Sequence, residues 1–360
     1  MEQYFAALNS LEKLTPLRFA QLLKFFDNDA EKIWKASRQE WQEAGIDFKA
    51  VTEIFAEKSE IDPDTVFRKL QKFGVKVLPI SAESYPKLLK EIYDPPPVLL
   101  VRGEFPLPVD DFAVAVVGSR VLTSYGRQAT HEIARGLAVA GVSIISGLAL
   151  GADAIAHAAV VELGGRTVAI LGNGIDTIYP PRNQQLADDI ISKGGAIISE
   201  FPIGTPPNNY NFPLRNRIIA GLSRGVVVSE GREKSGSLIT AALANECGRE
   251  VFAVPGSIFS ENSAGTNYLI QQGARPITSA KDVLESLGFE NLGEKAKVRE
   301  VVADSEEEAK LLKVLKKIPL HSDEITRQSG LTASEASSIL SLMEMKGLAK
   351  NLGGMNWIRS

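Results

Sequence analysis

The chain has very few of the residues that build disulfide scaffolds and metal centres. Cys247 is the only cysteine, so an internal disulfide and a zinc site with several thiolate ligands are both excluded. The histidines His131, His157 and His321 are too far apart in sequence for metal-ligand spacing, so we expect each at the surface or in packing. We therefore expect no metal and no cofactor. A single free cysteine also fits a reducing compartment.

Long apolar runs and an excess of positive charge are lacking as well. No stretch approaches the roughly 18 apolar residues of a membrane span. The start, Met1-Glu2-Gln3-Tyr4, lacks the basic and apolar regions of a signal peptide. Lysine and arginine number 40 against 44 aspartates and glutamates, for a net charge of −4. We expect a cytoplasmic protein without a membrane span, and any DNA site on it must be a local basic patch.

At 360 residues the chain is long enough for two or three domains of roughly 100 to 200 residues each. The expected segments are an all-α domain over residues 1–74, a linker and extension of the core over 75–110, a Rossmann-like domain over 111–290, a charged linker over 291–305 and a winged-helix domain over 306–360. Within the second segment, Tyr85-Pro86 and Pro95-Pro96-Pro97 argue against helix and favour a stiff, extended connection.

The central segment alternates apolar strand-like runs with helical stretches, which is typical of an α/β fold with a mostly parallel sheet. The predicted strands are Ala113 to Val117, Val142 to Ile145, Thr167 to Leu171, Ala196 to Ser199, Val226 to Ser229 and Val251 to Val254. The predicted helices are Tyr125 to Ala140, Ala152 to Leu163, Asn183 to Ser192, Leu214 to Leu222 and Ser237 to Cys247. Most strands are continuous apolar runs, as buried parallel strands require.

The C-terminal segment predicts three helices followed by a hairpin, the pattern of a winged helix. The helices are Glu306 to Lys317, Ser322 to Ser329 and Ala333 to Lys346, and Gly353-Gly354 marks the hairpin turn. The stretch from Ser334 to Lys346 would enter the major groove if this domain reads DNA. Its leading end carries little positive charge, so a protein-contact or vestigial role is favoured.

Ligands of an open parallel sheet collect at the carboxyl ends of the strands, beside helix N-termini. The loops there are small, polar and glycine-rich. The candidate binding residues in them are Gly118, Ser119, Arg120, Ser146, Gly147, Gly174, Arg182, Asn211, Phe212, Arg215, Arg217, Lys234, Ser235, Gly236 and Ser237. Serine hydroxyls and glycine amides donate to phosphate and the basic residues neutralise it, as a phosphodiester backbone requires.

The known nucleotide-binding motifs are incomplete in these loops. The run from Gly118 to Thr123 lacks the second and third glycines of a dinucleotide fingerprint, and Gly172-x-Gly174 is only a partial match. The run from Gly231 to Gly236 has P-loop spacing, but Ser237-Leu238 follows where Lys-Ser or Lys-Thr is required. NAD binding and Walker-type ATP hydrolysis are therefore disfavoured.

Several candidate residues have a plain structural alternative. Any one glycine loop is more simply a tight turn, although five loops at one rim weaken that interpretation. Arg215 and Arg217 point in different directions, so at most one faces a ligand and the other pairs with a carboxylate. Phe212 is a core plug or a base-stacking platform, with core favoured. Glu200 and Glu230 end strands where an enzyme would place an acid or base, or they orient those arginines.

Taken in order, these motifs resemble the DNA-processing A family, also called DprA or Smf. The matching motifs are Gly118-Ser119-Arg120, Ser146-Gly147 with Gly151-Ala152-Asp153, Gly174-Ile175-Asp176 with Tyr179-Pro180 and Asn183, Asn211-Phe212-Pro213 with Arg215-Asn216-Arg217, Lys234-Ser235-Gly236-Ser237 with Thr240-Ala241, and Val254-Pro255-Gly256. The resemblance spans roughly residues 110–285, and Asp94-Pro95-Pro96-Pro97 and Arg102-Gly103 extend it upstream. The terminal domains resemble the family's helical (SAM-like) and winged-helix appendages.

The resemblance implies a homodimer that binds single-stranded DNA and loads RecA recombinase onto incoming strands during natural transformation, without catalysis. It also implies that Arg120 and Phe212 contact DNA and that Leu269 and Ile270 lie at the dimer interface. One departure concerns Asn208-Asn209-Tyr210, where members of the family often have a basic residue. Lys234 or Arg182 would then replace that phosphate contact.

The alternative from another class is a nucleotide-processing enzyme of the lysine-decarboxylase-like (phosphoribohydrolase) fold. It would use Glu230 as its acid or base. Such enzymes carry a Pro-Gly-Gly-x-Gly-Thr-x-x-Glu motif that this sequence lacks. A transcription factor would rest on the winged helix alone.

Overall fold

The computed structural model describes residues 1–289, 306–315, 320–345, 349–351 and 354–359. The chain forms two compact units, Met1–Val298 and Arg299–Ser360. The charged linker predicted over residues 291–305 lies outside the described residues. The finer boundaries that we predict inside the first unit, at residues 74 and 110, stay predictions.

A nine-stranded sheet forms the centre of the first unit, in the order β1-β2-β6-β5-β4-β3-β7-β8-β9. Its strands are β1 (Val75–Pro79), β2 (Val98–Gly103), β3 (Ala113–Val117), β4 (Ser143–Ser146), β5 (Thr167–Ile170), β6 (Ala196–Ser199), β7 (Gly225–Val228), β8 (Glu250–Ala253) and β9 (Arg275–Pro276). From β6 to β9 in this order neighbouring strands run parallel, whereas β2 pairs antiparallel with β1 and β6. The predicted mostly parallel sheet is confirmed, and its six predicted strands lie within one residue of their expected ends.

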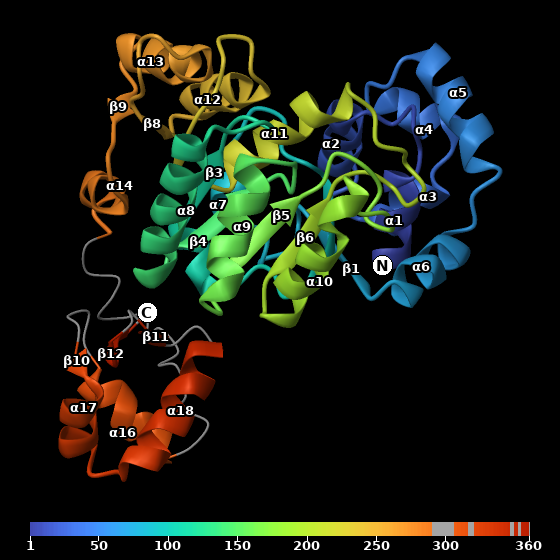
Figure 1. Ribbon diagram of the computed structural model, residues 1–360. Helices are drawn as coiled ribbons and strands as arrows, with labels where there is room; N and C mark the ends of the chain where they lie inside the picture. Colours follow the sequence, from blue (N-terminus) through green and yellow to red (C-terminus); the bar gives the residue numbers. More distant parts are fainter. Residues whose placement is uncertain (290–305, 316–319, 346–348, 352–353, 360) are drawn as a thin grey trace. The chain divides into compact units, whose positions relative to one another are not determined.

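Both faces of the sheet are apolar and covered by helices (Figure 1). Side chains alternate along each strand, so in β3 Val114 and Val116 enter one core cluster and Ala115 enters another. One face carries α8 (Ser124–Val139), α9 (Ala152–Glu162), α10 (Gln184–Ser192) and α14 (Ala280–Leu287). The other carries α7 (Lys87–Lys90), α11 (Asn211–Gly221), α12 (Gly236–Glu246) and α13 (Ala264–Gln271).

The five helices predicted between the strands are all present, and only the start of α11 was misplaced. It begins at Asn211, three residues before the predicted Leu214. Pro213 caused the error, because a proline excludes a helix interior but not a first turn, where its missing N–H has no helical partner in any case. Phe212 therefore belongs to the helix start rather than to the preceding loop.

The segment predicted as a linker and extension of the core contributes two strands to the sheet, although its prolines favoured an extended connection. The strands β1 and β2 pair with each other, and β2 pairs with β6. The short helix α7 follows Pro86 directly, and Pro86 occupies its N-cap position. The prolines lie between the strands and at a helix start, where they remove no ladder or helix hydrogen bond.

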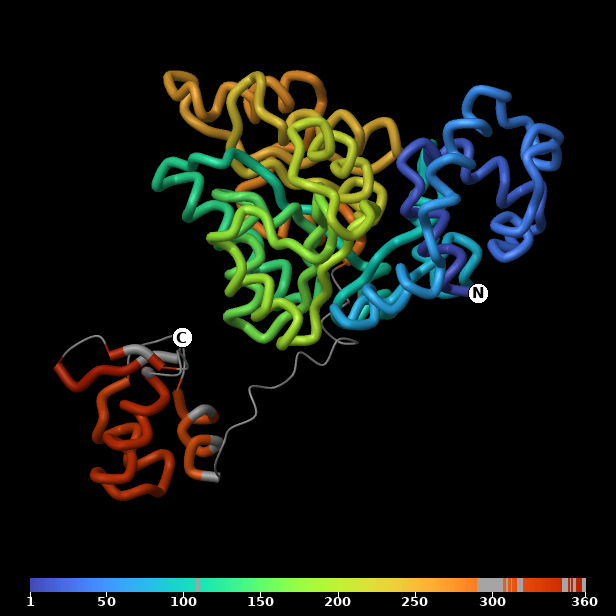
Figure 2. Tube along the Cα trace, turned by 90° about the vertical axis from the view of Figure 1, so that its right-hand side faces the viewer, coloured from blue at the N-terminus to red at the C-terminus, as the bar shows by residue number. Residues whose placement is uncertain are grey.

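The N-terminal residues form the predicted all-α region, drawn in blue (Figure 2). Its helices are α1 (Glu2–Asn9), α2 (Pro16–Phe25), α3 (Ala30–Lys35), α4 (Arg38–Glu43), α5 (Phe48–Lys58) and α6 (Pro63–Lys72). Short polar side chains begin most of them; Thr15, Asp29 and Ser37, for example, accept backbone N–H bonds of the first turn. One apolar cluster runs from Trp41 to Ile197 of β6, so these helices share a core with the sheet.

The second unit has the helices and sheet of a winged helix, as predicted. Its elements are α16 (Glu306–Val314), β10 (Leu320–His321), α17 (Ser322–Ser329), α18 (Ala333–Met345), β11 (Ala349–Asn351) and β12 (Asn356–Arg359). The strands form an antiparallel sheet in the order β10-β12-β11. Trp357, Leu340 and Leu311 pack in its core. Of the predicted turn Gly353-Gly354, the first residue lies outside the described residues.

Candidate nucleic-acid interface

A cleft of about 480 Å³, here called the carboxyl-edge cleft, opens beyond the carboxyl ends of β3 and β7. It is lined by the loops that follow these strands and by the first turns of three helices. Nine of the residues predicted from the sequence lie in its wall: Gly118, Ser119, Arg120, Phe212, Arg215, Lys234, Ser235, Gly236 and Ser237. The parallel sheet thus brings together loops that are far apart in the chain, as expected for this edge.

The helices α9, α11 and α12 all point their N-termini at this cleft, through Asp153, Phe212 and Ser237 respectively. A helix start has unpaired N–H groups and a partial positive charge, and both favour an anion. Gly236 begins α12, and a Cβ at this position would meet no atom within 4 Å. The missing side chain therefore leaves open space at the helix start, where a ligand can approach the backbone.

Cations outnumber anions in the cleft wall. Arg120, Arg215, Arg232 and Lys234 line it, against the single carboxylate Asp153. Burial raises the pKa of Asp153, although Arg215 and the N–H groups of two loop residues oppose this shift. Within the described part of the chain, Arg120 and Lys234 form no ion pair, whereas Arg232 lies 3.6 Å from Glu261. The exposed rim therefore offers positive charge to a ligand.

Arg215 is a buried cation behind this rim, only 5% exposed. Its Nη1 donates to the carbonyl of Gly147 at 2.8 Å and to that of Ile170, and its Nε donates to Asn216. Burial, with a smaller effect of Arg120, lowers its pKa to about 10, so it stays charged at neutral pH. A Cβ at Gly147 would lie within 2.6 Å of the guanidinium carbon, which explains the glycine there.

His157 lies buried in α9 and is neutral. Its Nδ1 is 2.7 Å from the Thr167 hydroxyl, which itself donates to the carbonyl of Ile144. Because that hydroxyl has a single proton, Nδ1 must be the donor to it, and Nε2 is left without a partner. Burial and then the charge of Arg215 lower the pKa of His157 to about 3. The expectation of a packing histidine holds here.

Arg217, which the sequence placed among the DNA-binding candidates, lies outside the cleft wall. Its guanidinium binds Glu200 through two bonds of 2.6 and 2.7 Å and reaches Asp94 at 2.8 Å. Burial lowers the pKa of Arg217, but these ion pairs outweigh burial and raise it overall. Of the two arginines, Arg217 is thus the one that pairs with carboxylates, and a DNA contact by Arg217 stays a prediction.

Five other candidates also lie outside the wall of the cleft. Ser146 is buried and donates to the Val116 carbonyl, Gly147 packs against Arg215, and the buried Gly174 amide donates to Thr205. Ser146 therefore connects β4 to β3, and a Cβ at either glycine would lie within 2.6 Å of another atom, as the plain alternative of a tight turn expects. Arg182 is exposed and Asn211 is half-buried at the start of α11, so a DNA contact by either stays a prediction.

The serines of the cleft use part of their hydrogen-bonding capacity within the protein. Ser119 donates to the carbonyl of Val121 at 2.8 Å, and the hydroxyls of Ser235 and Ser237 share one hydrogen bond of 2.5 Å. Since that bond uses one proton, one hydroxyl of the Ser235–Ser237 pair can still donate to a phosphate, whereas Ser119 is engaged.

Phe212 is half-buried and its ring faces two neighbours. The ring of Tyr179 stacks on it at a centroid distance of 5.7 Å and an angle of 22°, and Arg120 Cζ lies 5.6 Å from its centroid. Sequence reasoning favoured a core position for Phe212 and treated Tyr179 only as part of a loop motif. The signal it missed was an aromatic residue in the loop after β5, at the same edge of the sheet.

The two carboxylates considered as catalytic are both engaged by the protein. Glu230 is 2% exposed, and its oxygens accept the Thr123 amide at 2.8 Å and the Thr123 hydroxyl at 2.6 Å. Glu200 holds Arg217. Neither lines the carboxyl-edge cleft. Across the described ranges no cluster of three His, Cys, Asp or Glu side chains is arranged to hold a metal ion.

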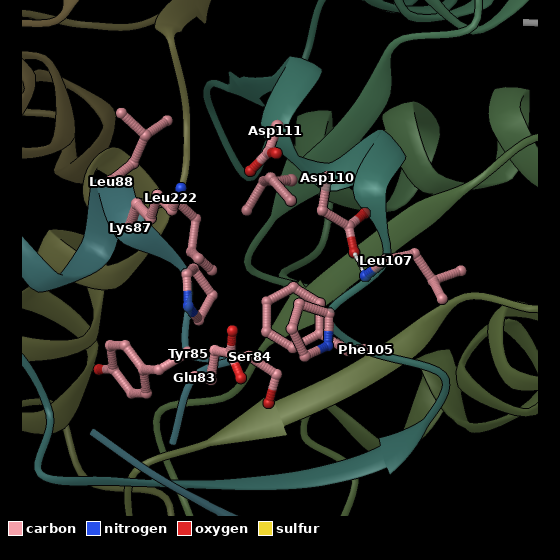
Figure 3. Close-up of a pocket in the computed structure, with 13 residues that line it drawn as sticks. Glu83, Ser84, Tyr85, Lys87, Leu88, Phe105, Leu107, Asp110, Asp111 and Leu222 are labelled. Atoms are coloured by element: carbon pink, nitrogen blue, oxygen red, sulfur yellow. Dashed lines mark hydrogen bonds between the residues drawn. The ribbon is translucent and has the colours of Figure 1, made fainter. Parts of the chain in front are cut away.

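A second cleft, here called the amino-edge cleft, has a volume of about 230 Å³ and lies beside the amino ends of β3 and β7 (Figure 3). Its charged residues are Glu83, Lys87, Asp110 and Asp111. Asp110 is held by Arg166, whose Nη2 lies 2.7 Å from its carboxylate. This cleft contains none of the residues that the sequence analysis selected.

Comparison with known proteins agrees with this arrangement. Residues 76–288 match the family described as DNA recombination-mediator protein A, and residues 295–355 match the DprA winged helix domain. The DNA processing protein DprA of Bacillus subtilis is 47% identical over 219 residues, which cover 61% of this chain and 73% of that protein. The chain belongs to the DNA recombination-mediator protein A family. The resemblance seen in the sequence motifs is thereby confirmed.

Solved structures of DprA share the fold. The DprA structure from Streptococcus pneumoniae has a TM-score of 0.70 and 36% identity, and the match covers 79% of this chain and 97% of that one. DprA from Helicobacter pylori, whose structure is described as showing a unique single-stranded DNA binding mode, has a TM-score of 0.53 and 32% identity over 59% of this chain and 95% of that one.

Of the two residues that the resemblance places at a dimer interface, Leu269 is 8% exposed and belongs to the core, and Ile270 is half-buried beside it. The interface itself stays a prediction.

Within the residues that the structure describes, no helix is long and apolar enough to cross a bilayer.

Proposed function

We propose that the protein binds single-stranded DNA in the carboxyl-edge cleft and acts in recombination as a binding protein rather than an enzyme. The observation that carries the proposal is the position of Arg120, which lies at a rim of cations, against an aromatic ring and beside three helix N-termini. Cations and helix N-termini bind phosphates, and an aromatic ring binds an unpaired base. The single-stranded DNA binding described for the Helicobacter pylori relative supports the proposal.

A single strand fits this cleft better than a duplex does. The bases of a duplex stack on one another, whereas those of a single strand are free to stack on aromatic side chains. The overall charge of −4 gives no general attraction to DNA, so binding depends on the few cations of the cleft. We propose roughly three to six phosphate contacts, each releasing counterions.

Titration of a labelled oligonucleotide at several salt concentrations tests this number. With about 0.7 units of slope per phosphate neutralised, log affinity should fall with log salt at a slope of roughly −2 to −4. The same oligonucleotide annealed to its complement should bind more weakly at matched salt. An affinity independent of salt, or a preference for duplex, would contradict the proposal.

We further propose that the protein protects incoming DNA and loads RecA recombinase onto it during natural transformation, in the cytoplasm. Membership of the DNA recombination-mediator protein A family supports this role. The measurement is the lag before RecA hydrolyses ATP on single strands coated with single-strand-binding protein. The protein should shorten the lag, and an unchanged lag over a range of protein concentrations would exclude loading.

A homodimer is proposed through the face of α13 that carries Ile270. A glutamate at Ile270 places charge in an apolar contact and should give monomers in sedimentation. Gln271→Glu adds the same charge to an exposed position on the same helix and is the matched control. Because Ile270 also touches the core, the melting temperature of both variants must be compared. A folded Ile270→Glu dimer would count against this interface.

The nucleotide-processing alternative finds no support in the carboxylates. The oxygens of Glu230 hold the start of α8, so they are not directed at a substrate in the cleft. Release of base from nucleoside monophosphates by the purified protein would revive that alternative.

A further inference from the structure

The amino-edge cleft has a largely apolar wall and stands apart from the proposed DNA site. It is lined by residues of the segments 83–88 and 105–111, together with Ile145 of β4 and Leu222 at the end of α11. Ile145, Leu222 and Phe105 are all buried. Because protein interiors leave few spaces of this size unfilled, an open apolar hollow at the surface is a place where a side chain of another molecule can be buried.

The volume of this cleft determines the size of its occupant. Sites for cofactors and drug-sized ligands have volumes of roughly 300 to 1,000 Å³, whereas the amino-edge cleft has about 230 Å³. This space fits one or two side chains rather than a cofactor. In protein interfaces, much of the binding energy comes from single anchor residues that fill pockets of this kind. The expected occupant is therefore an anchor side chain of a peptide segment.

Two of the three carboxylates at the rim are not neutralised by the fold. Asp110 is 8% exposed and is held by Arg166. Glu83 and Asp111 are exposed, and within the described ranges their carboxylates form no ion pair. Figure 3 shows these two residues on opposite sides of the cleft. Their charges favour a cation on each side and repel a phosphate backbone, so a basic peptide is favoured over a nucleic acid.

We propose that the amino-edge cleft docks an extended segment of a partner protein, in which one apolar side chain has an arginine or lysine two residues to either side. In an extended chain, side chains two positions apart point to the same face and are about 6.6 Å apart. The central side chain enters the cleft beside Phe105 and Leu222, and the two cations reach Glu83 and Asp111. The docking site is independent of the proposed DNA binding, because the two clefts open at opposite ends of the parallel strands.

The test measures binding of the fluorescein-labelled peptide Gly-Arg-Gly-Leu-Gly-Arg-Gly to the full-length protein by fluorescence anisotropy. A second peptide with serine in place of leucine keeps the charge and lacks the apolar anchor. It should bind at least about tenfold more weakly, because burial of the leucine side chain is lost. Equal binding of the two peptides would mean a general attraction of charges and would overturn the proposal. Absence of binding by the leucine peptide would overturn it as well.

Substitutions at the rim locate the bound peptide. Glu83→Lys and Asp111→Lys reverse exposed charges, so each should melt like wild type and weaken binding of the leucine peptide about three- to tenfold. Lys87→Glu replaces the cation of the rim and should strengthen binding about two- to fivefold. Glu53→Lys, at an exposed glutamate of α5 outside the cleft, is the matched control and should leave binding unchanged. Unchanged binding by both Glu83→Lys and Asp111→Lys would place the peptide elsewhere and exclude this docking site.

Discussion

The carboxyl-edge and amino-edge clefts open at opposite ends of the same parallel strands, and their charges differ in sign. The carboxyl-edge cleft has four cations and one carboxylate in its wall, and the amino-edge cleft has three carboxylates and one lysine (Figure 3). The number of helix starts differs too. The first turns of α9, α11 and α12 line the carboxyl-edge cleft, whereas the first turn of α7 lines the amino-edge cleft. Shape alone would not tell the two apart, but an anionic strand is attracted to only one of them.

The arginines beside the two clefts also differ in whether a carboxylate neutralises them. Beside the amino-edge cleft, Arg166 is bound to Asp110 and to backbone carbonyls, so its charge is neutralised within the fold. At the carboxyl-edge cleft, Arg120 has only the Phe212 ring, and Arg215 has carbonyls but no carboxylate within 4 Å among the described residues. Unneutralised cations near helix starts distinguish a ligand site from a structural ion pair.

The largest expected effect on DNA affinity comes from reversing the charge of Arg120, with the same reversal in the amino-edge cleft as its control. Arg120→Glu replaces an attraction by a repulsion and should weaken single-strand binding several-fold to a hundred-fold, on the order of 1 to 3 kcal/mol. Thermal stability should change little, because Arg120 is exposed. Lys87→Glu makes the same change at the exposed rim of the amino-edge cleft and should not alter DNA affinity. Equal losses from both variants would erase the distinction between the clefts.

A second prediction concerns acid stability behind the carboxyl-edge cleft. Burial lowers the pKa of His157 from 6.5 to about 3 in the folded protein. Between these values the unfolded chain binds the proton and the folded protein does not, so stability is complete above pH 6.5 and falls as the pH decreases. One such group contributes a slope of about 1.4 kcal/mol per pH unit.

His157→Asn keeps an N–H donor near the Thr167 hydroxyl but cannot be protonated in this range. Its unfolding free energy should depend less on pH between 4.5 and 6.5, as measured by urea denaturation at several pH values. Identical pH slopes for variant and wild type would mean that His157 is protonated in the folded state.

The smallest expected effect tests the position of the Phe212 ring. Gly172→Ala adds a methyl group where Phe212 Cδ1 would be 2.6 Å away, so the ring must shift from its place in the cleft. Affinity for a normal single strand should fall a few-fold, about 1 kcal/mol or less, because stacking depends on ring position. Affinity for an abasic strand serves as the control and should not change. A variant that binds the normal strand like wild type would show that the ring position is unimportant.

The sequence was most informative where the chain is buried. The strands from β3 to β8 were predicted within one residue because each is a continuous apolar run between turns. The run Val98 to Val101 is equally apolar, but the prolines before it suggested a linker, and its pairing with β6 depends on a segment far along the chain. Local pattern cannot reveal which distant strand offers an open edge.

For the binding site, position at the carboxyl edge was predictable and individual contacts were not. Arg120 and Lys234 follow strands directly, so the rule for parallel sheets places them correctly. The pairing of Arg217 with Glu200 was one of the alternatives, but its second partner, Asp94, belongs to a segment interpreted as a linker and could not be foreseen. The stack of Tyr179 on Phe212 joins two loops whose distance only the assembled sheet determines.

The buried charge of Arg215 has a consequence for the stability of the whole molecule. Removing a cation from water without a carboxylate in direct contact costs free energy in the folded state, even when carbonyls accept its hydrogen bonds and Asp153 lies in the same cleft wall. A phosphate in the cleft adds countercharge to the folded chain and not to the unfolded one. Nucleic acid is then also a folding ligand, and the melting temperature should rise with oligonucleotide concentration. The proposed binding surface is thus also the part of the protein whose charges are least balanced in the absence of a ligand.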